Sequence, residues 1–516
     1  MRVRGMGLRL VLCTWVWLFT GAVGWAAEQV ESLLSPATLE EAFTGLRAEA
    51  EGRREAAVAF LIEQGDLSLL PRLDEIRADA DRSLRQALKP IADAWKHRAN
   101  LGSADPDVRR SAAVDLGMSG RRTAIPWLEA AVIKESHRWV RYSMEEAIQL
   151  LKLASGNPAV RLTAVARLGD LRSQNAVPML KELVHAAGEP GAGEKEQSLG
   201  RAATAAIDQI ETWGDWATAF ETLFRGLSLS SILLIMSLGL AIVFGLMGVI
   251  NMAHGELIMI GAYATFLVQQ AFKAWFPEGW FDGYYLAALP ASFLAAALCG
   301  LVLEWTVIRF LYGRPLETML ATWGVSLIMI QAARVAFGDL TAVAAPGWLS
   351  GGIQAMVGVY LPFNRLFILG LSIVCVTGIY LLLFRSSLGL RIRAVTQNRS
   401  MSACLGIPTR AVDAYTFAFG SGLAGVAGWA LTLVGNVEPG LGQNYIVDSF
   451  MVVVTGGVGK LAGTIIASLG IGGLNKLLEP SLGAVFGKVI ILMLVILFLQ
   501  RRPSGLFAVK GRHADA

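Results

Sequence analysis

The chain has 516 residues, of which 54% are hydrophobic and only 17% are charged, and its mean hydropathy is +0.51. Such a composition excludes an ordinary soluble protein and indicates that lipid surrounds much of the chain. The net charge of +4 is small for this length, which argues against nucleic acid as a partner. Charged residues crowd residues 28–221, so we expect a soluble part followed by a membrane part.

The N-terminus has the pattern of a signal peptide. Arginines at positions 2, 4 and 9 precede the apolar run 10–23 and the small residues around Ala26. An uncleaved anchor is the alternative, but the run is shorter than the roughly 20 residues that a membrane span needs. The sequence therefore predicts a signal peptide over residues 1–26 and export of the segment that follows.

Residues 27–187 contain an internal repeat. The segment 105–109 (DPDVR) has Pro126 downstream, and the segment 157–161 (NPAVR) has Pro178 at the same offset. A capping residue, a proline and an amphipathic helix followed by a second helix resemble HEAT-type helical pairs, which must stack to cover their apolar faces. We expect a periplasmic HEAT-like domain, with a degenerate third copy near Val140; an irregular helical bundle is the alternative.

Residues 188–225 are expected to join the two parts. Residues 188–197 are rich in glycine, proline and charge, which suits a linker. Trp213, Trp216, Phe220 and Phe224 then recur at helical spacing, which is typical of an interfacial helix on a membrane surface. A core helix of the preceding domain is the alternative.

Residues 226–510 are expected to form an all-α, polytopic membrane domain. The hydropathy predicts spans at residues 229–250, 257–271, 285–305, 319–337, 366–384, 412–435 and 485–499. The apolar stretch 447–477 is interrupted by glycines, which predicts broken helices that line protein or a water-filled cavity. The total is seven spans plus a re-entrant hairpin, or nine spans.

The arginines define an orientation. The loop 385–410 has five arginines and no acidic residue, so it is expected to be cytoplasmic, and the basic tail after residue 500 is expected on the same side. Five spans separate this loop from the exported domain, and an odd number of crossings places the two on opposite sides of the membrane, as expected. We therefore expect a bacterial inner-membrane protein with its N-terminal domain in the periplasm and its C-terminus in the cytoplasm.

Enzyme and metal signatures give no match. The five histidines are far apart, which argues against a metal site. Residues 420–425 spell a dinucleotide fingerprint but fall inside a span, and the Gly459-Lys460 pair lacks the rest of a P-loop. We expect no enzyme activity and no cofactor, so a partner or an ion gradient must supply energy.

Polar residues at membrane depth are the candidate solute pathway, because such residues are costly in lipid unless they serve a purpose. The link between the first two predicted spans is the main candidate, either as a structural turn with its side chains at the interface or as a functional gate. Amide and hydroxyl groups suit a neutral, hydrogen-bonding solute. The candidate residues are Asn251, His254, Glu256, Thr322, Asn436 and Glu438.

Four motifs identify a family resemblance. They are residues 245–256 (GLMGVINMAHGE), residues 389–394 (GLRIRA) with Asn398, Ala403, Leu405, Gly406 and Ile407, residues 456–459 (GGVG), and residues 502–506 (RPSGL). Together they resemble the branched-chain amino acid permease family of ABC importers over about residues 220–510. A large exported N-terminal extension is similar to the urea-transporter permease branch of that family.

The resemblance implies a transport subunit that binds no ATP itself. It implies a second, homologous permease subunit, two cytoplasmic ATP-binding subunits and a periplasmic solute-binding protein as partners. It also implies a coupling loop that docks on the ATPase, with Gly389, Arg391, Arg393, Asn398, Ala403, Gly406 and Ile407. Urea is the expected solute. The alternatives are a branched-chain amino acid or short-chain amide permease, and a membrane-anchored sensor or scaffold; a gradient-driven carrier is disfavoured.

Overall fold

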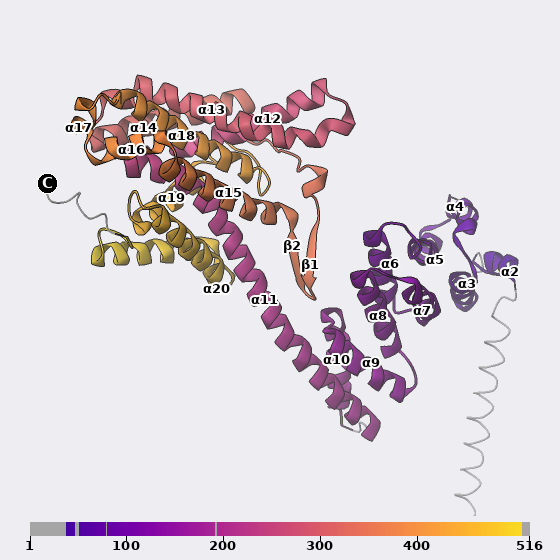
Figure 1. Cartoon of the computed structure of the whole chain (residues 1–516). Helices are drawn as coiled ribbons and strands as arrows, with labels where there is room; N and C mark the ends of the chain where they lie inside the picture. Colours follow the sequence, from indigo (N-terminus) through magenta and orange to yellow (C-terminus); the bar gives the residue numbers. More distant parts are fainter. Residues whose placement is uncertain (1–37, 47–50, 79, 191–192, 508–516) are drawn as a thin grey trace, which may run out of the picture. The chain divides into compact units, whose positions relative to one another are not determined.

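The computed structural model describes residues 38–46, 51–78, 80–190 and 193–507 (Figure 1). The predicted signal peptide lies outside these residues. The chain divides into two compact units, the first up to Gly214 and the second from Asp215. Both units are helical, as the fold prediction requires.

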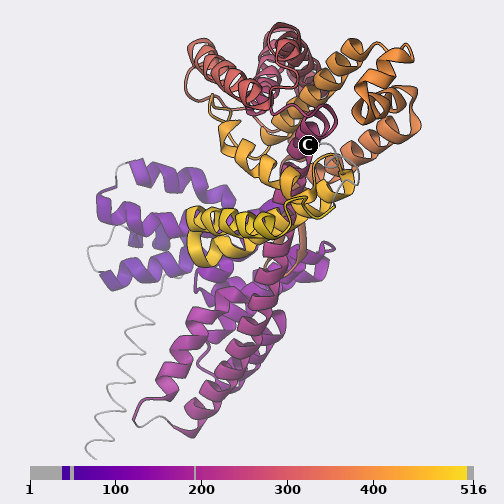
Figure 2. The same ribbon diagram turned by 90° about the vertical axis from the view of Figure 1, so that its left-hand side faces the viewer.

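Unit 1 is a series of short helices that lie side by side (Figure 2). Its helices are α2 (Leu39–Gly45), α3 (Glu51–Gln64), α4 (Leu70–Ala78), α5 (Arg82–Asn100), α6 (Pro106–Met118), α7 (Ile125–Lys134), α8 (Arg138–Leu153), α9 (Pro158–Leu171), α10 (Val177–Ala187) and the first part of α11 (Glu194–Ile242). Short 3-10 helices occupy Leu67–Leu69, Arg122–Ala124 and Gln174–Ala176.

The internal repeat is present in the described residues. The Asp105 carboxylate caps α6 by accepting from the Asp107 N–H at 2.9 Å, and Asn157 caps α9 by accepting from the Ala159 N–H at 3.0 Å. Each cap precedes a proline at the start of the helix, where the missing N–H costs nothing. Val140, where a third copy is expected, is the third residue of α8, as Val108 is of α6 and Val160 is of α9, and α8 packs between those two helices. The degenerate third copy stays a prediction.

The helix α11 differs from the expected linker and interfacial helix. It runs from Glu194 to Ile242, and its first part packs into the core of unit 1 through side chains such as Ala203 and Ile210. The Arg172 guanidinium lies 3.6 Å from the centroid of the Trp213 ring. The alternative of a core helix is therefore correct up to Trp213, while Trp216 is exposed and its place at a membrane surface stays a prediction.

Unit 2 contains most of the long apolar helices. After a π-helical turn at Val243–Met247 come α12 (His254–Trp275), α13 (Tyr284–Thr306), α14 (Pro315–Phe337), α15 (Phe363–Arg385), α16 (Ser387–Gln397), α17 (Arg399–Cys404), α18 (Thr409–Leu431), α19 (Gln443–Gly456) and α20 (Leu461–Arg501). Short 3-10 helices occupy Glu278–Gly283, Ile308–Phe310 and Gly347–Leu349. Among the described residues, six helices are long and apolar enough to cross a membrane, namely α11 to α15 and α20.

The helix α18 packs in the middle of unit 2 through its glycines. A Cβ on Gly420 would lie 2.6 Å from Val243, next to α11. A Cβ on Gly425 would lie 2.6 Å from Ala296 of α13, and one on Gly428 would collide with the Ile258 carbonyl oxygen of α12. Small residues let helix backbones approach closely. In lipid, where apolar side chains gain nothing by leaving the solvent, this close van der Waals packing is what holds helices together. The glycines of α18 therefore serve the close packing of this helix against α11, α12 and α13.

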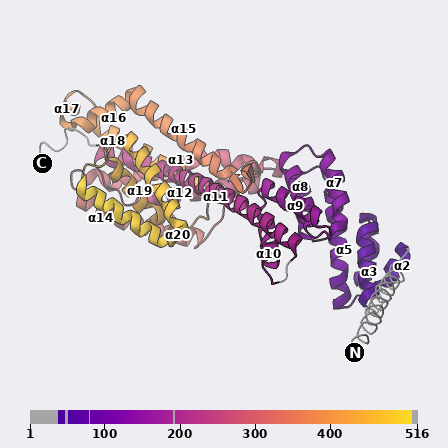
Figure 3. The same cartoon turned by 90° about the horizontal axis from the view of Figure 1, so that it is seen from below.

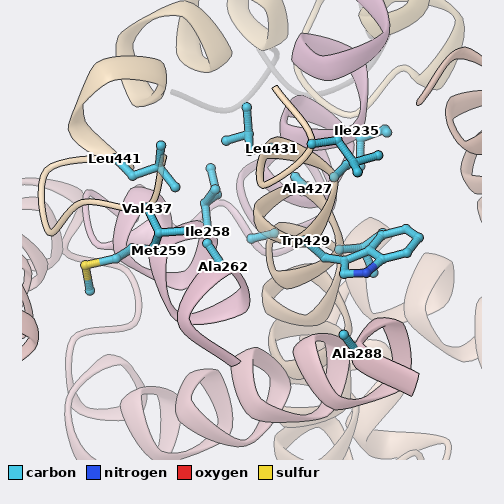
Figure 4. Close-up of a cluster of buried hydrophobic side chains, with 14 of the residues drawn as sticks. Ile235, Ile258, Met259, Ala262, Ala288, Ala427, Trp429, Leu431, Val437 and Leu441 are labelled. Carbon is cyan, nitrogen blue, oxygen red and sulfur yellow. The ribbon is translucent and has the colours of Figure 1, made fainter. Parts of the chain in front are cut away.

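An aromatic pair holds α13 against α18. The rings of Tyr285 and Trp429 stack with centroids 4.6 Å apart. Each side chain also donates to the other's backbone carbonyl oxygen at 3.0 Å, which satisfies both buried donors. Side chains of α12, including Ile258 and Ala262, lie beside Trp429 in the same cluster (Figure 4).

The last helix, α20, joins two segments that were expected to be separate. A non-helical residue, Gly483, divides it into two arms that pack together through side chains such as Ile471 and Ile491 (Figure 1). A two-stranded antiparallel hairpin, β1 (Gly352–Met356) and β2 (Val359–Pro362), was not predicted.

Candidate functional site

The helix α12 begins inside unit 2. The first apolar stretch ends in the π-helical turn, after which Gly248 adopts a φ of +71°. His254, the first residue of α12, then lies beside the interior of α11, because its Nε2 atom is 3.3 Å from the Met236 carbonyl oxygen and its ring lies next to Gly239. The link 248–253 therefore returns along α11, and α12 begins beside the interior part of α11.

The helix α19 begins at the same place. Gly442 immediately precedes it and packs against Gly255 of α12, where an added Cβ would lie 2.9 Å from the Gly442 carbonyl oxygen. Two helix N-termini therefore meet inside the apolar unit. The leading N–H groups of a helix have no intrahelical acceptor and carry partial positive charge, so they favour carbonyl or carboxylate oxygens.

A carboxylate lies at this junction. Glu256 of α12 is 1% exposed, and its Oε1 atom accepts from the Gln443 side chain of α19 at 2.8 Å. The same Gln443 nitrogen lies 3.0 Å from the hydroxyl of Ser326 on α14. One amide therefore joins three helices, and its position fixes the carboxylate relative to both N-termini.

Three buried polar atoms at the junction have no hydrogen-bond partner in the described structure. They are Asn251 Nδ2, His254 Nδ1 and Glu256 Oε2. Their residues are at most 1% exposed, so the alternative in which these side chains lie at the interface is wrong. Buried polar groups are normally paired, and groups that are not paired mark a place where a polar ligand gains hydrogen bonds.

The other predicted pathway residues lie on either side of this cluster. The Thr322 hydroxyl of α14 accepts from the Met252 N–H at 3.0 Å and so fixes the link 248–253. Glu438 accepts from the Asn444 amide at 2.9 Å, and Asn436 is exposed. Within the described residues, no hydrogen bond joins Asn436 or Glu438 to Glu256.

The chemistry available at the junction is recognition through hydrogen bonds and charge. Its groups are one carboxylate, two amides, an imidazole and hydroxyls. In the part of the chain that the structure describes, no group of three or more His, Cys, Asp or Glu side chains is placed to hold a metal ion.

The predicted coupling loop folds as two short helices, α16 and α17, at the end of α15 (Figure 3). Gly389 packs on α15, where a Cβ would collide with the carbonyl oxygens of Leu382 and Leu383. Asn398 caps α17 by accepting from the Met401 N–H at 2.9 Å, and Gly406 makes the following turn with a φ of +82°. These three residues therefore shape the segment.

One face of α16 and α17 is open. Arg391, Arg393 and Ala403 are exposed, whereas Ile407 is half-buried and packs in a small apolar cluster with Val412 of α18. The same segment exposes four large apolar side chains, Leu388, Leu390, Met401 and Leu405, to between 41% and 75%. Apolar and arginine side chains together are typical of a protein interface.

Sequence reasoning did not find the ion pair that ties this segment to α18. The Arg399 Nη2 atom, on the first residue of α17, lies 2.5 Å from a carboxylate oxygen of Asp413. The Arg399 guanidinium also lies 4.9 Å from the centroid of the Tyr312 ring, between α13 and α14. The Asp413 side chain is 5% exposed, so this carboxylate depends on Arg399 for compensation.

Gln443 and Ser326 were also missed. Neither carries a charge, and nothing local in the sequence distinguishes them from other polar residues near the ends of apolar runs. The one available signal was Gly442, since a glycine directly before a helix permits another backbone to approach.

Known proteins are similar to the chain over unit 2. Residues 222–499 match the family model described as "Branched-chain amino acid transport system / permease component". The permease BraD of Pseudomonas aeruginosa is 30% identical over 292 residues, which cover 55% of this chain and 94% of BraD. LivH of Escherichia coli is 28% identical with the same coverage, and a probable LivH of Methanocaldococcus jannaschii is 26% identical over 54% of this chain and 90% of its own length.

The matched residues 222–499 include α12 to α19 and most of α20, and unit 1, which ends at Gly214, lies outside them. Because the family model matches more than half of the chain, and the chain covers nearly all of BraD, the chain belongs to the family of permease components of branched-chain amino acid transport systems.

Proposed function

We propose that the chain is the transmembrane permease subunit of an ABC importer and that its solute passes the junction of α12 and α19. The observation that carries this proposal is the meeting of two helix N-termini beside the buried, half-paired carboxylate of Glu256. Transporters commonly place solute sites where broken helices present their ends at membrane depth. Hydrolysis of ATP would belong to partner subunits.

The junction suits a small solute with N–H donors. Glu256 Oε2 is an acceptor without a donor, Asn251 Nδ2 is a donor without an acceptor, and the two helix N-termini add partial positive charge. A zwitterionic amino acid would place its ammonium group at Glu256 and its carboxylate at the helix ends. The names of the relatives, which are branched-chain amino acid permeases, favour this solute.

Urea is the second candidate. Its amino groups would donate to Glu256, and its carbonyl oxygen would accept from Asn251. The observation that favours urea is the helical unit 1, most of which lies outside the residues matched to the relatives and which resembles the extension of the urea-transporter branch.

The coupling partner would dock on α16 and α17. Their exposed leucines and arginines would contact two cytoplasmic ATP-binding subunits, and the Arg399–Asp413 ion pair would transmit the movement to α18. A second homologous permease subunit, a periplasmic solute-binding protein and the bacterial inner membrane complete the proposed assembly, with unit 1 in the periplasm and the C-terminus in the cytoplasm.

Uptake by a deletion strain decides between the solutes. Loss of radiolabelled leucine uptake with normal urea uptake supports the amino acid, and the reverse result supports urea. Normal uptake of both contradicts both assignments. Co-purification of an ATPase that is lost when α16–α17 is altered argues against a membrane-anchored sensor or scaffold.

A further inference from the structure

An apolar slot in unit 2 opens beside the α16–α17 segment. Its volume is about 640 Å³, and α11, α15 and α20 form its walls. Its apolar lining includes Leu238, Ile242, Val376, Tyr380 and Ile465. Tyr380 and Phe384 are about half exposed, so the slot faces the outside of the helical unit and not the junction at Glu256.

The charged side chains of the slot lie at one end. Its lining, all of it within the described residues, includes Arg393 of α16 and Lys460 before α20, and it includes no Asp or Glu. Lys460 is the N-cap of α20, and no side chain caps that helix. The first N–H groups of α20 therefore add partial positive charge to the same end, and this charge favours an anionic group.

The slot is elongated along α15. Its lining on that helix runs from Val376 to Phe384, which is about 12 Å of helix at 1.5 Å per residue. Most of the lining is apolar, and the two cations, Arg393 and Lys460, are its only charged side chains within the described residues. An acyl chain with an anionic headgroup has the same division into an apolar length and a charged end.

We propose that this slot binds an anionic phospholipid, with an acyl chain along α15 and the phosphate at Arg393 and Lys460. Basic pockets between membrane helices bind such headgroups, and each cation near a membrane surface contributes about 1 kcal/mol. The lipid would join α16 to the start of α20, so it would hold the proposed coupling segment against the membrane helices. The proposal concerns the leaflet on the α16–α17 side and does not depend on which solute is carried.

The test is lipid binding by the purified full chain in detergent, measured by native mass spectrometry and by thermal unfolding. Phosphatidylglycerol should bind and raise the unfolding temperature more than phosphatidylcholine does. The double variant Arg393→Gln/Lys460→Gln should weaken the preference for the anionic lipid roughly 30-fold, as expected for two lost cations. Arg410→Gln, which removes an exposed arginine outside the slot, should retain the preference.

Two further arms identify the occupant. A photo-crosslinking residue at Thr377, an exposed position in the slot, should yield phospholipid adducts in native membranes. An adduct with the second permease subunit instead would overturn the proposal, as would equal lipid preference in all variants. Stabilisation by soluble glycerol phosphate to the same extent would also overturn it, because the anion alone would then suffice. None of these outcomes requires uptake, so they are independent of the proposed transport.

Discussion

Arg399 compensates the buried carboxylate of Asp413 across 14 positions of the sequence, with the two side chains 2.5 Å apart. Arg399 is 47% exposed and lies on α17, whereas Asp413 is 5% exposed and lies on α18. The pair therefore connects the segment proposed to receive work from the ATPase with the helix that packs against α11, α12 and α13.

Because Asp413 is buried and Arg399 is half exposed, replacing Arg399 should destabilise the protein more than replacing Asp413. Arg399→Gln should lower stability by about 2 to 3 kcal/mol, because it leaves a buried carboxylate without compensation. Asp413→Asn should cost less, and the double variant should be more stable than Arg399→Gln alone. Thermal unfolding of the purified chain measures this, with Arg314→Gln, from an exposed ion pair, as the control. Additive losses in the double variant would refute the coupling.

Glu256 should matter for transport more than for folding. In Glu256→Gln the side chain keeps its shape and can still accept from Gln443, but the negative charge is lost. A hydrogen bond to a charged group is worth about 1.5 to 3 kcal/mol, so uptake should fall about 10-fold to 100-fold. Initial uptake rates in vesicles measure this, and Glu317→Gln, which alters an exposed carboxylate, should transport normally. Unchanged uptake in Glu256→Gln would place the solute elsewhere.

The junction of α12 and α19 should not tolerate a methyl group. In Gly442→Ala the new Cβ would lie 2.7 Å from the Cα atom of Gly255, and backbone atoms cannot rotate away as a side chain can. We expect a loss of about 1 to 3 kcal/mol in stability and a loss of uptake. Gly435→Ala is the matched control, since a Cβ there meets no atom within 4 Å. Thermal unfolding measures the stability of both variants, and equal stability would contradict the close approach of Gly442 to Gly255.

The apolar helices could be predicted because membrane spans depend on local composition. The span expected at residues 285–305 is α13, Tyr284–Thr306, and the one expected at 319–337 lies within α14. In lipid a long apolar run satisfies its backbone hydrogen bonds by forming a helix, so the positions of these helices follow from hydropathy. The two arms of α20 were expected in separate apolar segments, 447–477 and 485–499, and in the structure Pro480 and the non-helical Gly483 lie between the arms.

The contacts of the site could not be predicted in the same way. Gln443 and Glu256 are 187 residues apart, and their pairing depends on how α12 and α19 approach each other. Arg399 was recognised as one arginine in a basic loop, but its partner lies beyond the turn at Gly406. Hydropathy reports which residues are buried and not which residues face each other.

Unit 1 should lose stability in acid through one carboxylate. Glu135 accepts from Arg109 at 2.7 and 3.0 Å, and these hydrogen bonds lower the pKa of Glu135 from 4.5 to about 2. Because the folded-state pKa is the lower one, this contribution is complete above pH 4.5 and is lost as the pH falls toward 2.

Glu135→Gln should therefore lower stability by about 2 to 3 kcal/mol at pH 7 and should remove that part of the pH dependence. Denaturation of the full chain, followed by tryptophan fluorescence at several pH values, measures the difference. Glu129→Gln, from the more exposed pair with Lys152, should change stability by less than about 1 kcal/mol. Parallel pH curves for wild type and Glu135→Gln would contradict the assignment.

The proposed orientation has a direct test at α17. Ser400 lies on that helix beside Asn398, whose side chain accepts from the Ser400 hydroxyl at 2.9 Å. The segment 385–410 has five arginines and no acidic residue, which favours the cytoplasm. A cysteine at Ser400, in a chain whose exposed Cys404 is replaced by serine, should therefore resist a membrane-impermeant thiol reagent in intact cells and react in inverted vesicles. Labelling from the periplasm would reverse the topology, and α16–α17 could then not contact an ATPase.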